Sequence, residues 1–362
     1  MTLTEFSYYS RKMAPLIVIL ILVILIFFAA FQLLLVYFKG EKRTVTGSSS
    51  QTVTPTIAIS PTFNKISAPQ LADVKPSNGA KYVMDTIDGQ PITATSAANV
   101  YLLPKQSDNF GYLSKIYLMA RAMGFDTDVT KHRLLENKRV VFYDGLRKLI
   151  IDITDFNFNY QYTITKDNTQ FQAVTTVDTN SVEETAIEFL RKLDRYPQEL
   201  AQGKRNYVYM KFNPDTNELS ILPSATTDTN MVEVDFYRPD IGDLPVVSPK
   251  FFNSSHYVVL ALTSEGPKVV RAQMTLYEKS INNIGVYPLK TGEAAWKELQ
   301  EGGGLIVSGQ DAVQGEVKIK NMYLAYLDLE DYQPYLQPVF VFLGEGNFVA
   351  YVPAITKEYL TP

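Results

Sequence analysis

The chain has 362 residues, of which 46% are hydrophobic and 20% are charged. This is the composition of a globular protein, and it excludes a collagen-like or wholly disordered chain. The sequence contains no cysteine and only two histidines. It therefore excludes disulfides, thiolate catalysis, cysteine-ligated metals, lipoprotein acylation and a histidine-rich metal site.

Near the N-terminus, residues 16–38 form an apolar run whose only polar side chain is Gln32. As a helix this run would span roughly 35 Å, enough to cross a hydrocarbon core about 30 Å thick. The alternative is a cleaved signal peptide, whose apolar region would be about 7–15 residues long. The length of the run favours an uncleaved transmembrane anchor that contacts the lipid bilayer, preceded by a short cytoplasmic tail at 1–15.

The composition of the segment after the anchor predicts a tether, followed by residues that pack on the edge of a folded domain. Residues 44–62 are rich in Ser and Thr and carry no charge, which is typical of a linker, and an O-glycosylated stalk is the alternative. We expect the linker and domain-edge segment to cover 39–94. Because long domains are translocated largely regardless of flanking charge, we place the N-terminus in the cytoplasm and the C-terminal domain outside the cell.

The charge of the main part of the chain argues against one class of partner. Beyond residue 43 the chain holds 29 Lys and Arg and 36 Asp and Glu, a net charge of −7. Nucleic-acid binding needs a basic surface. The acidic balance therefore predicts no nucleic-acid partner.

Helical spacing of apolar residues predicts three amphipathic helices. The first covers 111–123. The second begins at Ser181, which forms a capping box with Glu184. The third covers 291–300 and carries the only tryptophan, Trp296, which we expect to be mostly buried against the C-terminal strands.

Strands are predicted wherever apolar residues alternate or run together between turn residues. The pair Asp144-Gly145 predicts a tight hairpin, because it tolerates positive φ. The predicted strands are 138–143, 146–154, 156–164, 206–212, 218–222, 231–237, 256–262, 268–277, 315–327, 336–343 and 347–355.

The order of these elements predicts an α+β fold. One plan recurs, a short helix followed by a hairpin or meander, so we expect antiparallel sheets with short covering helices in two or three helix-plus-hairpin units. With the transmembrane helix placed first, the folded part divides into a first α+β region at 95–245 and a second at 246–362.

The C-terminal sequence resembles a known family of regulators. It contains I-K-N-M-Y-L-A-Y (319–326), L-Q-P-V-F-V-F (336–342) and F-V-A-Y-V-P-A-I (348–355), after the helix with Trp296. Together with one N-terminal anchor, this pattern resembles the YycH/YycI-type membrane-anchored regulators of bacterial sensor kinases and the PepSY-like helix–hairpin modules. The resemblance implies an extracytoplasmic domain that acts through protein contacts, and it assigns no functional residue.

The sequence shows no catalytic motif. Nucleophile-elbow, zinc-protease, phosphate-loop and dinucleotide-binding patterns are all missing, so we predict that the chain is not an enzyme and binds no cofactor. His256 follows Ser254 and Ser255, but neighbours on an extended chain point to opposite faces and no acid partner is indicated. We interpret His256 as a structural residue at the start of a strand.

Acidic residues offer no metal site of recognisable spacing. The sequence D-T-N occurs at 178–180, 215–217 and 228–230, and none of the three has the spacing of a calcium loop. Asp328 and Glu330 lie near a predicted hairpin tip, where acids are usually solvated. We therefore predict no metal.

One aromatic cluster is a candidate contact site. Tyr332 and Tyr335 lie at the turn before the strand 336–343, where tyrosine rings could form a patch for a protein partner. The function predicted first is a single-pass membrane-anchored binding or regulatory protein. The alternatives are a structural envelope or assembly component and, less favoured, an extracytoplasmic hydrolase with a scattered carboxylate site.

Overall fold

The computed structural model describes one compact unit within Thr56–Pro362. The residues it describes are 58–71, 75–76, 80–105, 111–164, 177–309 and 315–361. The predicted membrane span at 16–38 lies outside these residues. Among the described helices, none is long and apolar enough to cross a membrane.

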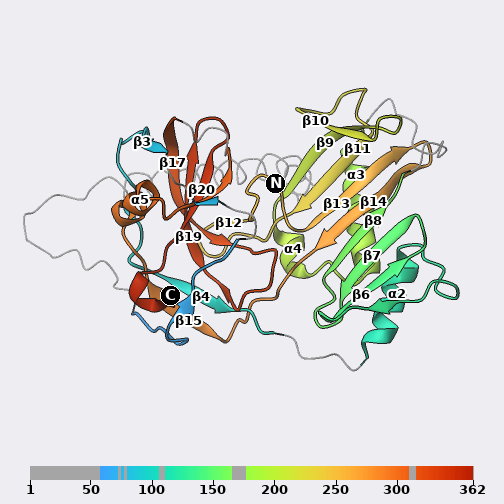
Figure 1. Cartoon of the computed structure of the whole chain (residues 1–362), viewed down its shortest axis with the longest axis horizontal. Coiled ribbons are helices and arrows are strands. Elements are labelled where there is room, and N and C mark those ends of the chain that lie inside the picture. The colour runs from blue at the N-terminus through green and yellow to red at the C-terminus, as the bar shows by residue number, and fades with distance from the viewer. Residues whose placement is uncertain are drawn as a thin grey trace, which may run out of the picture. The chain divides into compact units, whose positions relative to one another are not determined.

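A nine-stranded antiparallel sheet dominates the first half of the fold (Figure 1). Its order is β10-β9-β11-β13-β14-β8-β7-β6-β5. The strands are β5 (Arg133–Leu134), β6 (Arg139–Tyr143), β7 (Arg147–Asp152), β8 (Phe158–Tyr162), β9 (Arg205–Asn213), β10 (Glu218–Leu222), β11 (Met231–Phe236), β13 (Tyr257–Thr263) and β14 (Gly266–Met274). Strand β8 pairs with β14, which lies more than 100 residues later in the chain.

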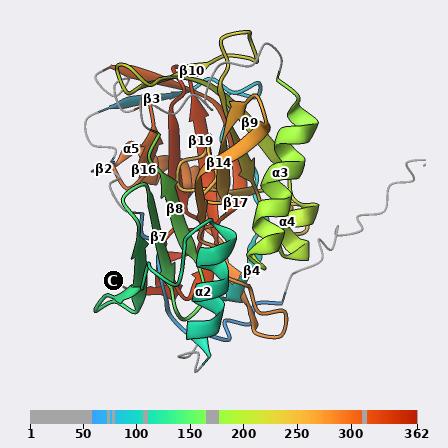
Figure 2. The same ribbon diagram turned by 90° about the vertical axis from the view of Figure 1, so that its right-hand side faces the viewer.

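Three helices cover one face of this sheet (Figure 2). They are α2 (Tyr112–Ala122), α3 (Thr179–Lys192) and α4 (Gln198–Gln202). Apolar residues at helical spacing, such as Val182, Ala186 and Leu190 of α3, share one core cluster with alternate strand residues of β11 and β14, such as Val234 and Ala272. Burial of these residues is the main force that holds helices and sheet together.

A second sheet of seven strands is built mainly from the C-terminal part of the chain. Its strands are β2 (Lys75–Pro76), β3 (Lys81–Met84), β12 (Val246–Val247), β16 (Leu305–Ser308), β17 (Glu316–Leu327), β19 (Pro338–Gly344) and β20 (Val349–Pro353). Helix α5 (Gly292–Gln300) packs against it through buried Ala295 and Leu299. Strands β3 and β12 both pair with β17 in parallel.

Short strands complete the fold beside the second sheet. A three-stranded sheet has the order β15-β4-β18, and β1 pairs with β21 in parallel. The bounds are β1 (Ile66–Ser67), β4 (Ala97–Leu102), β15 (Ile284–Pro288), β18 (Tyr335–Leu336) and β21 (Leu360–Thr361), with a 3₁₀ helix at Lys357–Tyr359. The segment 39–94 thus contributes three short strands in its described part.

The predicted α+β class with repeated helix-plus-hairpin units is wrong. The described residues are mainly β, with four short α-helices, and α2 and α3 share one sheet instead of each covering a hairpin of its own. The reason is long-range pairing, because β13 and β14 insert beside β11 and β8 and join the hairpins into one sheet. Local patterns do not specify such pairing.

Two local expectations also change. Helix α3 begins at Thr179, and its N-cap is Asp178, whose carboxylate accepts from the N–H groups of Asn180 and Ser181. Ser181 is therefore inside the helix and forms no capping box. Trp296 is only half-buried, with its ring 6.1 Å from that of Phe342 on β19.

Candidate functional site

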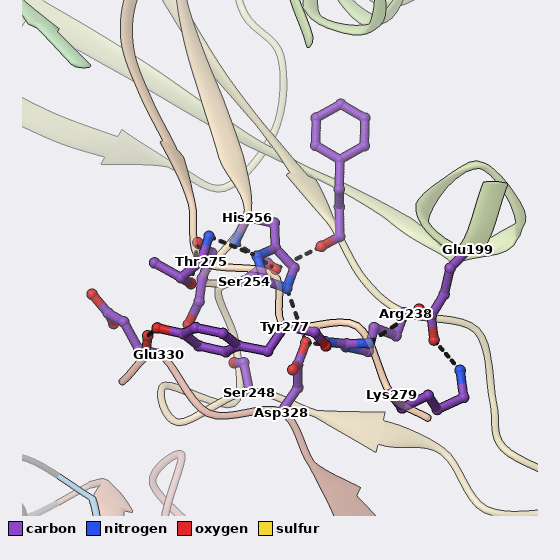
Figure 3. A network of polar contacts seen from close by, with 12 residues as sticks. Glu199, Arg238, Ser248, Ser254, His256, Thr275, Tyr277, Lys279, Asp328 and Glu330 are labelled. Atoms are coloured by element: carbon purple, nitrogen blue, oxygen red, sulfur yellow. Dashed lines mark hydrogen bonds and ion pairs between the residues drawn. The ribbon is translucent and has the colours of Figure 1, made fainter. Parts of the chain in front are cut away.

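Asp328, just after β17, is the centre of a buried network of charged side chains (Figure 3). Its Oδ2 atom lies 2.8 Å from Arg238 Nε and 2.9 Å from His256 Nε2. The contact with Arg238 Nε is an ion pair that is not aligned as a hydrogen bond. Burial by itself raises the pKa of Asp328, but the Arg238 charge and the His256 contact outweigh burial and hold this pKa at about 2. Asp328 is therefore ionised at neutral pH.

Arg238 continues the network toward helix α4. Its side chain follows β11 and is only 2% exposed. Nη1 lies 3.1 Å from Glu199 Oε2, Nη2 donates to the carbonyl oxygen of Tyr277, and Lys279 pairs with the other oxygen of Glu199. A buried charge is costly unless it is paired. The network therefore ties α4 and the nine-stranded sheet to the end of β17 in the seven-stranded sheet.

The ring of His256 is held on both sides. Nδ1 accepts from the backbone N–H of Thr275 at 3.4 Å, so Nε2 carries the proton that faces Asp328 in the neutral ring. Ser254 Oγ donates instead to the carbonyl oxygen of Phe236 and accepts from the backbone N–H of His256. The histidine has an acid partner that the sequence did not indicate, but Ser254 does not face its ring, and this arrangement does not activate a serine.

Beside this network the surface is hollowed by three adjoining pockets that share Asp155. Their volumes are about 270, 470 and 380 Å³, far more than one water or ion fills. We call them together the charged groove. It lies between the β7–β8 turn, the end of α3, the segment after β14 and the loop before β18.

The floor of the charged groove is the β7–β8 turn. Asp152 Oδ1 accepts from the backbone N–H of Thr154, and Asp155 Oδ1 accepts from that of Asn157. Phe156 has a φ of +60°, a left-handed conformation that non-glycine residues adopt infrequently. Two side-chain-stabilised turns thus hold the acidic residues of the floor in one arrangement.

Arg195 supplies the principal positive charge at this floor. It follows α3, and its Nη2 donates to Asn157 Oδ1 at 2.6 Å, while its buried Nε has no hydrogen-bond acceptor among the described residues. Burial lowers the pKa of Arg195, and the nearby carboxylates of Asp155 and Glu278 oppose this. Burial raises the pKa of Asp155, and Asp152 adds to the increase while Arg195 opposes it.

The candidate residue Tyr332 lies on the rim of the charged groove, and Tyr335 lies elsewhere. The hydroxyl of Tyr332 donates to the carbonyl oxygen of Leu103 at 2.9 Å, and its ring packs edge-on against Tyr277 at 5.4 Å. The ring of Tyr335 lies 5.1 Å from that of Phe63, among residues of the second core. The two tyrosines therefore do not form one patch.

The charged groove and the buried network share structural parts. Tyr277 lines the groove, its carbonyl oxygen accepts from Arg238, and its hydroxyl donates to the carbonyl oxygen of Glu330. Thr275 lines the groove and contacts His256 through its backbone N–H. Because the segment 275–277 is fixed from behind by charged contacts, the groove has a rigid back wall.

Metal ligation has no geometric support in the described ranges. No group of three or more His, Asp or Glu side chains in them is placed to hold an ion. Asp178 caps α3, Asp328 contacts Arg238 and His256, and Glu330 accepts from Gln273. His132, half-buried in the loop before β5, contacts the Tyr117 hydroxyl through Nδ1 at 3.0 Å.

Several residues of the site were missed by sequence reasoning. Arg195 and Glu199 lie four residues apart at the α3–α4 connection, Arg238 follows β11, and no recognised motif connects them. The available signal was a charge next to large apolar residues, as for Asp155 before Phe156 or Arg238 after Phe236-Tyr237. When its neighbours are buried, such a charged side chain needs either an ion-pair or hydrogen-bond partner, or access to solvent in a groove.

Sequence comparisons supply no family for this chain. No family model matches the sequence, and no curated protein matches it. A solved structure of an uncharacterised protein from Eubacterium rectale is similar over 77% of this chain and 90% of that chain, at 15% identity and a TM-score of 0.35. Such values do not establish a shared fold, so function has to be inferred from the site itself.

Proposed function

We propose that the protein is a membrane-tethered extracytoplasmic binding protein whose charged groove binds an extended polar segment of a protein partner. The single observation that carries the proposal is the groove itself, a hollow with acids and bases on its floor and an aromatic rim. Its size exceeds that needed for an ion, and its mixed charges suit a polypeptide that offers both carboxylate and cationic groups.

The groove offers charges that a partner can pair. Lys105, Arg139 and Glu278 all line the groove and are exposed. Neither Arg139 nor Glu278 has an ion-pair partner among the described residues. The rim ring of Tyr332 is held by Leu103 and Tyr277, so it presents area to a ligand with little loss of conformational entropy.

The membrane tether rests on the apolar run at 16–38, and the extracytoplasmic location rests on the length of the domain that follows it. In this location the groove would face partners in the envelope. The resemblance to membrane-anchored sensor-kinase regulators favours a regulatory role for such binding.

A hydrolase is the second candidate, and one observation favours it: burial raises the pKa of Asp155 in a groove that also holds Asp152. Against it, an oxygen of each carboxylate already accepts a hydrogen bond within the turn. Asp155→Asn separates the two functions. It abolishes acid catalysis, whereas a binding groove keeps its partner with modestly altered affinity.

The test is photo-crosslinking of the full chain in the membranes of its own cells. Benzoylphenylalanine is placed at Lys105 on the groove rim and, as a control, at exposed Lys148 on β7 outside the groove. We expect an adduct of defined mass from position 105 only, and we expect Arg139→Glu to reduce it at least fivefold while Lys148→Glu leaves it unchanged. Equal adducts from both positions, or none from position 105, would refute the binding groove.

A further inference from the structure

The edge strand β10 (Glu218–Leu222) exposes two large apolar side chains to solvent. Leu219 and Ile221 are 54% and 73% exposed, and both project from the same face of the nine-stranded sheet because they are two residues apart. On that face they lie beside Phe212 and Met210 of β9, their Cα partners. Met210 is buried in an apolar cluster, so the exposed pair continues an apolar surface to the edge of the sheet.

Among the described residues, no strand pairs with the outer side of the β10 backbone. Strand β10 pairs with β9 on its inner side, and it is the last strand in the sheet order (Figure 1). Edge strands are usually protected by shortness, charge, proline or a covering segment. In the described part of the chain the other edge strands are shorter or covered: β5, β2, β12 and β18 have two residues each, β3 has four, and β15 is bridged by Ser60. Strand β10 has five residues, and its only charge is Glu218 at one end.

The sequence of β10 is compatible with a second copy of itself. In a two-fold antiparallel pair centred on Ser220, Leu219 lies opposite Ile221 of the second copy, and Glu218 lies opposite Leu222. No like charges oppose each other, and the apolar residues meet on one face. Asn217, with a φ of +57°, and Pro223 bracket the strand symmetrically about Ser220, so the pairing would be limited to these five residues.

We propose that β10 is a self-association surface, through which two copies of this chain pair their nine-stranded sheets edge to edge about a two-fold axis at Ser220. This inference is independent of the charged groove. A strand of another protein could also pair with an open edge. A second copy is favoured because its β10 pairs in register about Ser220, opposes no like charges, and ends at the same bracketing residues on both sides. Five paired residues make a small interface, so the dimer dissociates on dilution.

Because the chain has no cysteine, a single introduced cysteine reports on this geometry directly. Opposite residues of an antiparallel pair have Cα atoms about 4.5–5.5 Å apart, within the range of a disulfide. In the full-length chain in detergent micelles, Ser220→Cys is oxidised with copper phenanthroline. The matched control is Thr216→Cys at the hairpin tip, which is also exposed but lies far from its own copy in the proposed pair.

We expect Ser220→Cys to form a disulfide-linked dimer at least tenfold faster than Thr216→Cys. Sedimentation should also show a concentration-dependent dimer of the unmodified chain that Ser220→Lys weakens at least tenfold, because two lysines would then face each other. A chain that stays monomeric overturns the proposal, and so does a dimer that crosslinks equally at both positions. Either result would leave the open edge to another partner or to none.

Discussion

At the residue scale, the stability of the fold depends on how buried charges are paired. Asp328 neutralises Arg238 where both side chains are buried. Removing one partner of a buried pair leaves the other charge uncompensated, which costs far more than the pair contributes when intact. We expect Asp328→Asn to lower the free energy of unfolding by about 3–5 kcal/mol, measured by urea denaturation.

An exposed ion pair provides the matched comparison. Glu316 contacts Lys81 at 2.8 Å between β17 and β3, and both side chains are largely open to water. Solvent screens such pairs, so Glu316→Gln should leave the urea midpoint nearly unchanged. Equal effects of the two substitutions would show that Asp328 does not hold the buried network together.

A second buried acid gives the fold a pH dependence. Asp235 on β11 is fully buried, and burial, with the Glu233 charge, raises its pKa to about 7. Its carboxylate accepts from the Ser254 N–H and the Asn206 amide, which limits the shift. Because the folded pKa lies above the unfolded value of 3.8, the folded state binds the extra proton, and stability falls as pH rises from about 4 to 7.

Asp235→Asn should remove most of this fall. The shift corresponds to about 4 kcal/mol across the whole window. Thermal melts at pH 5 and pH 8 sample its upper two units, about 3 kcal/mol. Burial also raises the pKa of Glu233, so a smaller fall in the same direction remains in the variant. Asp215→Asn, at the exposed hairpin tip, is the control. An unchanged pH profile for Asp235→Asn would contradict the assignment.

At the element scale, the N-cap of helix α3 is Asp178 and not the expected Ser181. Asp178 accepts from two backbone N–H groups there, whereas the side chain of Ser181 lies within the first turn. Asp178→Ala should cost about 1 kcal/mol in chemical denaturation, and Ser181→Ala should cost clearly less. The reverse order would restore Ser181 as the cap.

Local sequence patterns predicted most individual elements. The helices at 111–123 and 291–300, the Asp144-Gly145 hairpin and the strand at 218–222 are all present within a few residues. Their signals are short-range, because periodicity and turn chemistry act over a few residues. Helix α4 was missed because it has only five residues and is fixed by Leu200 in the core and by Glu199 in the buried network.

At the scale of the whole molecule, prediction failed where distant segments meet. The pairing of β8 with β14 and of β3 with β17 depends on which faces are left to bury, and no local pattern contains that information. The charged groove could not be predicted for the same reason, because its residues Asp155, Arg195 and Tyr332 come from three distant segments of the chain. Tyr332 was named as a candidate contact because an aromatic residue at a turn is conspicuous by itself, and its contact role stays a prediction.

Orientation in the membrane is the last property to test at this scale. The proposed topology places residues 1–15 inside the cell and everything after the anchor outside, although the basic residues flanking 16–38 do not favour this direction by themselves. In the cysteine-free chain, Ser48→Cys and Ser7→Cys are compared in intact cells with a membrane-impermeant maleimide. Ser48→Cys should be labelled, and Ser7→Cys should react only after lysis. The opposite pattern would place the folded domain in the cytoplasm, where the charged groove could not meet an envelope partner.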